Sequence, residues 1–462
     1  MIGESQSSLF LLISCSDSIW DMYKYHQYVD SPAKAVGLAI NSGTDMDCGG
    51  VVRDELDVAI REGYTSYDTV DQSLVRLFTA RIRLGLFDSY EDQPYMNYPK
   101  SAIGSPENRQ LARRIAQESL VLLKNQEDIL PLQISRNSKI ALIGPHINSS
   151  VKLCGNYFGD LPDILSPLNV LQQRLGSQLL YTQGCAIQGE IVDGVAKSVF
   201  FAAQADAVVL FMGIDSSLEN EGHDRYSIDL PQAQRDVIDA VCSVNSKVIL
   251  VLINGGSLDL SFVRDDVHCI KAVIEAFYPG EEGANAIADT IFGISNPSGR
   301  LPLTIFDKGF VEKVDFLDMS MRTGPGRTYR FYQGTPVYPF GYGLSYTSFS
   351  YDLVSQSSAQ DRDLSIISVL VKLTNTGSRP GAHSVLSFIE TDHPNCPRRQ
   401  LFDVQKFFLD PKESLEFSVM VSPKSAGCFD LEGKPSVEEG IYYVSVGDLK
   451  FALKQDSSVS MI

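Results

Sequence analysis

The sequence predicts an α/β protein that ends in an all-β domain. Between residues 139 and 276, apolar runs alternate with segments of helical periodicity. These runs are apolar nearly throughout, as are strands buried on both faces of a parallel sheet. After residue 346, short segments alternate apolar and polar residues, which is typical of antiparallel strands. At 462 residues, the chain is long enough for two or three domains.

In the first predicted domain, residues 1–88, short strands alternate with helices. Pro32 suits the first turn of a helix, and the last helical segment places Leu74, Phe78 and Ile82 on one stripe. Because a whole β/α barrel takes about 250 residues, we predict that this segment is the C-terminal remnant of a (β/α)8, or TIM, barrel. The predicted elements are a buried strand at 9–15, a strand at 44–48, and helices at 18–28, from 32, at 51–63 and at 69–86.

A segment rich in Pro, Tyr and Asn, residues 89–107, is predicted to be a linker. It leads into the second predicted domain, an α/β sandwich at residues 108–310, which begins with a long helix at 108–124. Its other predicted elements are strands at 139–143, 207–211, 248–252 and 272–276 and helices at 231–243 and 284–292.

Residues 311–345 are rich in Gly, Pro and Tyr with little periodicity, so we predict a second linker there. The last domain, residues 346–462, is predicted to be a small β-sandwich, with a turn at 375–377. Its predicted strands are 364–373, 383–390, 415–421 and 440–447.

The charge balance limits the possible partners. The chain carries 39 Lys and Arg against 57 Asp and Glu, a net charge of −18. This balance argues against a nucleic-acid partner, because phosphate backbones bind clustered Lys and Arg. The negative net charge is compatible with a neutral substrate such as a sugar. It is equally compatible with a charge whose only effect is to keep the protein in solution. No apolar run approaches the roughly 20 residues that span a bilayer, so we predict no membrane partner.

Eight cysteines are scattered along the chain, and none forms a CxxC pair or a Cys/His cluster. We therefore expect no zinc site, and the cysteines are either buried thiols or members of long-range disulfides. A sequon at Asn148 favours a secreted setting. The apolar run at residues 9–15 resembles part of a signal peptide, but it is preceded by Glu4 and no basic residue, so no signal is predicted.

The most informative stretch is 218–225, Leu-Glu-Asn-Glu-Gly-His-Asp-Arg, which follows the predicted strand 207–211. Functional loops of α/β domains follow the carboxyl ends of strands. Cleavage of a glycosidic bond needs two carboxyl groups, one that protonates the leaving oxygen and one that attacks or activates water. Glu219 and Glu221 are candidate proton donors, and Arg225 could bind either Asp224 or a sugar hydroxyl. The alternative is a solvated acidic loop with a local Asp–Arg pair.

Other motifs indicate no cofactor and no metal. Residues 279–283 lack the lysine and the glycine spacing of phosphate-binding loops, so nucleotide binding is not expected. The Asp-rich segment 43–50 lacks calcium-loop spacing, and we interpret it as a tight turn. His26, His146 and His223 are isolated, and no GxSxG nucleophile elbow occurs.

A set of motifs follows one order along most of the chain. They include GTDMDCG at 43–49, ESLVLLKN at 118–125, and PGRTYRFY and PFGYGLSY within 325–346. The other matching segments are 23–28, 83–87, 130–132, 141–145, 155–157, 219–225, 278–280 and 296–302. Each alone is weak, but together they resemble glycoside hydrolase family 3, in particular its β-xylosidase and α-arabinofuranosidase branch.

This resemblance implies a barrel, an α/β sandwich and a fibronectin type III-like domain. It implies exo-hydrolysis of non-reducing β-xylosyl or related residues of an oligo- or polysaccharide, outside the cell. The reaction would retain configuration and use no cofactor. The sandwich would lend an acid/base glutamate to a barrel aspartate. Glu221 is our assignment because it precedes the Gly-x-Asp-Arg run of the family; Glu219 is the alternative, and Glu219 and Arg225 are expected to contact the substrate.

The sequence departs from the family at the nucleophile, which the resemblance places at the first aspartate of an S-D-C-D run. An alignment without gaps matches this run to residues 14–17, Ser-Cys-Ser-Asp, so that Cys15 occupies the expected nucleophile position. A shift of two residues would make Asp17 the nucleophile, but loses the register further along the chain.

Two explanations of this departure remain open. Residues 1 to about 15 could replace a lost upstream region, as in an incomplete gene model whose earlier exons encode the nucleophile. The chain could instead be a diverged, non-catalytic carbohydrate-binding or scaffolding protein. In both cases we expect the chain alone to be at least roughly 10³-fold less active than a full-length relative.

Overall fold

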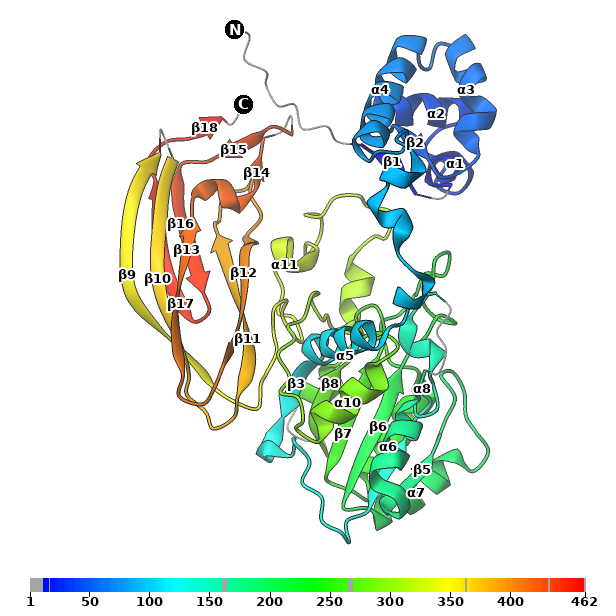
Figure 1. Cartoon of the computed structure of the whole chain (residues 1–462), viewed down its shortest axis with the longest axis vertical. Helices are drawn as coiled ribbons and strands as arrows, with labels where there is room; N and C mark the ends of the chain where they lie inside the picture. The colour runs from blue at the N-terminus through cyan, green and yellow to red at the C-terminus, as the bar shows by residue number, and fades with distance from the viewer. Residues whose placement is uncertain are drawn as a thin grey trace. The chain divides into compact units, whose positions relative to one another are not determined.

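The computed structural model describes residues 11–15, 17–159, 164–264, 269–361, 364–430 and 433–460. The chain divides into two compact units, one up to Ala102 and one from Ile103 onward. The first contains helices and two short strands, and the second contains a six-stranded sheet and a β-sandwich (Figure 1).

In the first unit, two short parallel strands alternate with four helices. Ile13 of β1 pairs in register with Met46 of β2. The helix at Pro32 begins as predicted, because the proline occupies its first turn and the Ser31 side chain accepts a hydrogen bond from the Lys34 N–H. The elements are β1 (Ile13–Ser14), α1 (Ser18–Lys24), α2 (Pro32–Asn41), β2 (Met46–Asp47), α3 (Val51–Arg61) and α4 (Tyr67–Arg83).

One expectation for this unit is wrong. The predicted buried strand 9–15 is reduced to β1, in which Ile13 is 47% exposed; residues 9 and 10 lie outside the described part of the chain. The predicted apolar stripe of α4 is largely exposed: Phe78 is 41% and Ile82 is 63% exposed. The core is built largely by the small residues of α2, and the buried residue of α4 is Ser73.

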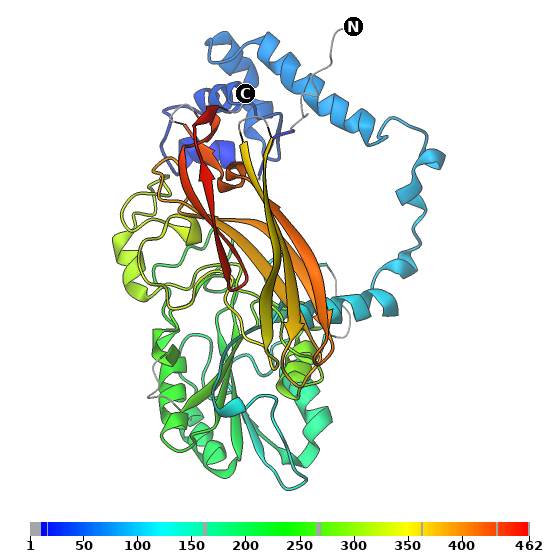
Figure 2. The ribbon, with the colours of Figure 1, turned by 90° about the vertical axis from the view of Figure 1, so that its left-hand side faces the viewer.

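Between α4 and the second unit, the chain forms short 3-10 turns, which Figure 2 shows as a succession of helical turns. The next helix, α5, spans Pro106–Ser119. Its N-terminal cap is Ser105, whose side chain accepts a hydrogen bond from the Asn108 N–H at 3.3 Å. The predicted helix 108–124 is therefore wrong beyond residue 119. The apolar residues after it form β3 (Val121–Asn125), which is buried in the sheet and pairs with β8 in antiparallel orientation.

The sheet has the strand order β3-β8-β7-β6-β4-β5, with all strands parallel except β3. Every residue of β4, β6 and β7 is buried, as their apolar sequences predict. The four predicted strands are confirmed, whereas β5 was not predicted. The bounds are β4 (Ile140–Ile143), β5 (Leu179–Thr182), β6 (Ala207–Gly213), β7 (Val248–Ile253) and β8 (Ile270–Glu275).

Helices cover both faces of this sheet (Figure 1). One apolar core contains residues of α5, α6 (Pro167–Leu175) and α10 (Gly283–Ile291). The other contains residues of α7 (Gly194–Gln204) and α8 (Gln232–Cys242). The predicted helices 231–243 and 284–292 are confirmed as α8 and α10. A disulfide between Cys242 and Cys269 joins the end of α8 to the residue before β8.

In its last part, the second unit has two larger antiparallel sheets that share one apolar core, so the predicted β-sandwich is confirmed. A disulfide joins Cys396 to Cys428. One sheet contains β9 (Phe349–Asp361), β10 (Leu364–Asn375) and β13 (Ser414–Val421). The other contains β11 (Gly381–Glu390), β12 (Arg399–Leu409), β16 (Gly440–Val446) and β17 (Leu449–Gln455). A third, small antiparallel sheet contains β14 (Cys428–Phe429), β15 (Pro435–Val437) and β18 (Val459–Ser460).

Candidate active site

The predicted site stretch, residues 218–225, lies in the loop 214–231 at the carboxyl edge of the parallel sheet. It follows β6, and the segments after β7 and β8 begin at the same edge, because parallel strands end on the same side (Figure 1). Side chains that are far apart in the sequence therefore meet here.

Glu219 is surrounded by hydrogen-bond donors from these neighbouring loops. Its Oε2 accepts a hydrogen bond from the Gly256 N–H at 3.1 Å and lies 3.5 Å from Arg225 Nε. Its Oε1 accepts hydrogen bonds from the Gly255 N–H and, at 2.8 Å, from the Tyr278 hydroxyl. We call Glu219, Arg225, Gly255, Gly256 and Tyr278 the Glu219 clamp, because together they fix the loop against the ends of β7 and β8.

The two glycines of the clamp leave room for this arrangement. A Cβ atom on Gly255 would lie 2.9 Å from Glu219 Oε1, and one on Gly256 would lie 2.5 Å from Arg225 Nη2. Arg225 also donates a hydrogen bond to the Ser257 carbonyl at 3.1 Å. It thus pairs with Glu219, and within the described residues it forms no ion pair with Asp224, whose side chain is exposed.

Glu221 lies at the tip of a tight turn just beyond the clamp. The Asn220 and His223 backbones exchange hydrogen bonds of 3.4 and 2.9 Å, and Gly222 takes the positive φ of +74° that the turn requires. Glu221 is exposed. Within the part of the chain that the structure describes, its carboxylate has no hydrogen bond or ion pair, so it is free to meet a substrate.

Sequence reasoning missed the buried acid beneath the clamp, Glu275, at the end of β8. It is 1% exposed, and burial raises its pKa to about 8. Its Oε1 accepts a hydrogen bond from the Phe277 N–H at 3.2 Å. Burial also raises the pKa of the Tyr278 hydroxyl, which therefore remains a donor to Glu219. The sequence did offer a signal for Glu275, because an acidic residue near the end of the otherwise apolar predicted strand 272–276 is unusual.

A second missed group supports the start of the loop. Asp215 is 2% exposed, and its Oδ1 accepts hydrogen bonds from the N–H of Ser217 at 3.0 Å and from its hydroxyl at 2.5 Å. Its Oδ2 binds Lys152. His146 is fully buried, and burial lowers its pKa to about 4, so the ring is neutral near pH 7. The contacts of Asp215 with Ser217 and Lys152 hold the loop where it leaves β6.

Comparison with known proteins identifies this domain. Residues 120–346 match the model described as "Glycosyl hydrolase family 3 C-terminal domain". About half of the chain is thus similar to the C-terminal domain of glycosyl hydrolase family 3. The matched segment includes the Glu219 clamp, Glu221 and the whole six-stranded sheet.

Proteins similar to most of the chain include β-xylosidases. It is 33% identical over 479 residues to "Probable beta-D-xylosidase 7" of Arabidopsis thaliana, an alignment that covers 96% of this chain and 62% of the relative. It is 34% identical to "Beta-xylosidase/alpha-L-arabinofuranosidase 1" of Medicago sativa subsp. varia, with 96% and 61% covered. A solved family 3 exo-β-xylosidase in complex with a xylobiose aziridine activity-based probe is 28% identical, has a TM-score of 0.84, and covers 99% of this chain and 62% of its own. The chain thus spans about three fifths of the length of these relatives.

The expected nucleophile positions of the family-3 resemblance lie in the first unit. Cys15 is exposed, and its carbonyl accepts hydrogen bonds from Ser18 N–H at 3.0 Å and Ser18 Oγ at 2.8 Å. Asp17 precedes α1 with a left-handed φ of 57°, and its carboxylate lies close to Gly49, where a Cβ atom would be 2.5 Å from Oδ1. Ser16 lies outside the described residues. Cys15 and Asp17 thus belong to the first unit, whereas Glu221 belongs to the second.

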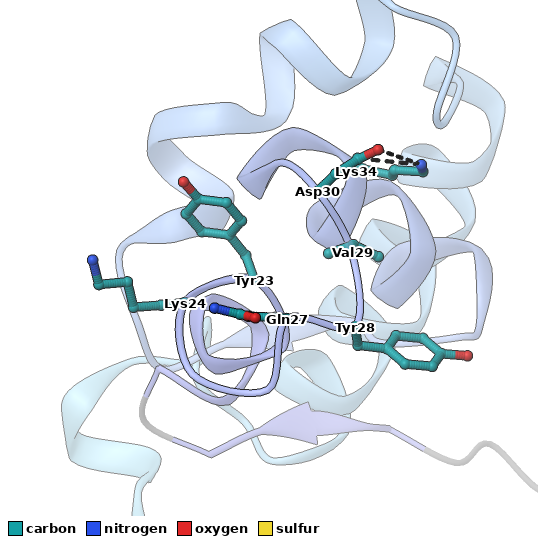
Figure 3. A pocket seen from close by; sticks show the side chains of 7 residues that line it. All are labelled: Tyr23, Lys24, Gln27, Tyr28, Val29, Asp30 and Lys34. Carbon is teal, nitrogen blue, oxygen red and sulfur yellow. Dashed lines mark hydrogen bonds and ion pairs between the residues drawn. The ribbon is translucent and has the colours of Figure 1, made fainter.

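The first unit also contains a shallow cavity of about 570 Å³ near α1 and α2. Figure 3 shows its lining, with the Lys34–Asp30 ion pair of 3.2 Å on one side and the rings of Tyr23 and Tyr28 pointing in different directions. None of the predicted site residues lines it. Among the described residues, no group of three or more His, Cys, Asp or Glu could hold a metal ion, and no helix has the length and apolarity to cross a membrane.

Proposed function

We propose that this chain is part of an exo-acting glycoside hydrolase that removes non-reducing β-xylosyl, or related β-glycosyl or α-arabinosyl, residues with retention of configuration. The observation that carries the proposal is a pair of glutamates with opposite environments. Glu219 is occupied by several donors, whereas Glu221, two residues further, is exposed and unpaired within the described chain.

In this proposal Glu221 is the acid/base residue. In a retaining mechanism, one carboxyl group protonates the leaving oxygen and then deprotonates the attacking water, while a second carboxylate forms the covalent intermediate. A carboxylate offers about four lone-pair sites, and Glu219 already uses both of its oxygens within the clamp. Glu219 and Arg225 then act on substrate chiefly by fixing the position of Glu221, rather than by the direct contact that the sequence suggested.

The second carboxylate is where this chain departs from the family pattern. Asp17 is the candidate nucleophile, and Cys15 stands at the position where the family pattern has the aspartate. This substitution specifically favours a second candidate function, a non-catalytic carbohydrate-binding or scaffolding protein, because a cysteine there does not provide the carboxylate of the family mechanism.

The same proposal includes the partners and the setting. The substrate is an oligo- or polysaccharide such as xylan, with no organic cofactor, no metal, no nucleic acid and no membrane involved. We also propose an extracellular location and a fibronectin type III-like identity for the β-sandwich at residues 346–462. The disulfides Cys242–Cys269 and Cys396–Cys428 support an oxidising compartment.

The direct test is to assay the purified chain on an aryl β-xyloside with a weakly acidic leaving group, alongside its Glu221→Gln variant. Because this leaving group requires protonation, a loss of turnover of at least about 10²-fold in Glu221→Gln would support a hydrolase with this acid/base residue. Glu439→Gln, an exposed carboxylate of the β-sandwich, is the matched control and should leave turnover unchanged. Glycan binding without turnover would favour the second candidate function.

A further inference from the structure

A cavity of about 740 Å³ borders the site loop within the second unit. Its lining comes from residues 188–190, from the loop between Ile214 and Asp229, and from the first turns of α8. Pockets that bind small ligands have volumes of about 300–1,000 Å³, so this cavity is large enough for one or more sugar rings.

The walls of this loop cavity are fixed before any ligand binds. Gln234 of α8 is fully buried, and its Nε2 donates hydrogen bonds to the Ile187 carbonyl at 2.9 Å and the Gly213 carbonyl at 2.7 Å. Its Oε1 accepts a hydrogen bond from the Gly213 N–H at 2.8 Å. One side chain therefore ties the 187–190 segment to the end of β6 and to α8. A preformed site binds more tightly because little conformational entropy is lost on binding.

The lining of the loop cavity fits a neutral, hydroxyl-rich ligand. Carboxylates of Glu190, Asp224, Asp229 and Asp236 line it, and they would repel an anion but accept hydrogen bonds from hydroxyl groups. Tyr226 also lines it and is 97% exposed. An uncovered aromatic ring beside hydrogen-bonding groups suits a sugar, which presents C–H groups on its ring faces and hydroxyls at its edge.

The position of the loop cavity relative to Glu221 indicates which part of a glycan it would hold. His223 and Asp224 line the cavity and follow Glu221 by two and three residues, in or directly after the same tight turn. A sugar in the cavity would therefore lie next to the carboxyl group that protonates the leaving oxygen.

We propose that the loop cavity binds the leaving-group side of a β-linked xylo-oligosaccharide, with one sugar ring stacked on Tyr226. This inference rests on the proposed function, because it identifies the glycan by the bond that Glu221 would protonate. The binding itself requires no turnover, so it can be measured whether or not the chain is catalytically active.

The test is calorimetric titration of the whole chain with xylotetraose, combined with a separate assay of aryl β-xyloside hydrolysis. Tyr226→Ala should weaken xylotetraose binding roughly three- to tenfold, the effect expected for the loss of one aromatic contact. Tyr226→Phe, which keeps the ring, should bind within about twofold of the unchanged chain. Tyr181→Ala removes a tyrosine that is 46% exposed on β5 and is the matched control, with unchanged affinity expected.

Two results would overturn the inference. One is the absence of xylotetraose binding by the unchanged chain at millimolar concentration; the other is equal affinity of the unchanged chain and Tyr226→Ala. Either result together with normal aryl xyloside hydrolysis would leave the proposed function in place. Tyr226-dependent binding without hydrolysis would support the cavity while contradicting catalysis by this chain.

Discussion

Replacing Glu219 by glutamine should loosen the site loop without removing the exposed acid. The substitution keeps the shape of the side chain but replaces one oxygen by an N–H donor group. The Tyr278 hydroxyl can reverse and accept a hydrogen bond, whereas the N–H groups of Gly255 and Gly256 cannot. In either orientation of the amide, at least one of these two N–H groups loses its acceptor, and the ion pair with Arg225 is lost. The loss of a hydrogen bond to a charged acceptor costs about 2 kcal/mol.

This cost can be measured by hydrogen exchange at the two glycine amides. A loss of about 2 kcal/mol corresponds to roughly 30-fold faster exchange of the Gly255 and Gly256 N–H groups, if they exchange through local opening of the loop. Glu221→Gln is the matched control, because its side chain lies two residues away and is exposed, and it should leave both amides unchanged. Unchanged exchange in Glu219→Gln would refute the conclusion that Glu219 holds the loop.

Three further predictions concern stability. Glu275→Gln should lessen the fall in melting temperature between pH 5 and pH 8, measured by thermal unfolding. Burial raises the folded-state pKa of Glu275 from 4.5 to about 8, so its stabilising contribution is complete below pH about 4.5 and is lost as the pH rises to about 8; an equal fall in the variant would contradict this. Asp289→Asn should lower the free energy of unfolding, measured by denaturant titration, by about 3–5 kcal/mol, because the fully buried Asp289 carboxylate binds both Arg113 and Arg174. A loss below about 1 kcal/mol would argue against a structural role of Asp289. Limited proteolysis should cleave residues 1–88 before 108–310, because apolar residues of α4 are exposed; early cleavage within the sheet would contradict this.

The central strands of the α/β sheet could be predicted because they are buried on both faces and are therefore apolar throughout. The edge strand β5 could not be predicted, since it has only four residues and only the first of them is buried. β3 was mistaken for the end of a helix because leucine and lysine also favour helices, and only pairing with β8 decides between the two.

The candidate site was predictable in part. Two glutamates after a predicted strand indicated where an acid/base residue could lie. Their different environments could not be predicted, because the donors to Glu219 lie 36 to 59 residues further along the chain and meet it only through the order of the strands. The sequence left Asp224 and a sugar hydroxyl open as partners of Arg225; among the described residues its ion-pair partner is Glu219 of the same loop.

The most direct test of the acid/base role uses a full-length β-xylosidase whose C-terminal domain is replaced by residues 120–346 of this chain. Glu221→Gln should lower kcat/KM for xylobiose by about 10²–10⁴-fold, because its leaving group needs protonation. For an aryl xyloside with a strongly acidic leaving group, the loss should be less than about tenfold, and azide should restore part of the turnover by replacing the water that Glu221 activates. An equal loss on both substrates, or no loss on either, would contradict the assignment of Glu221 as the acid/base residue.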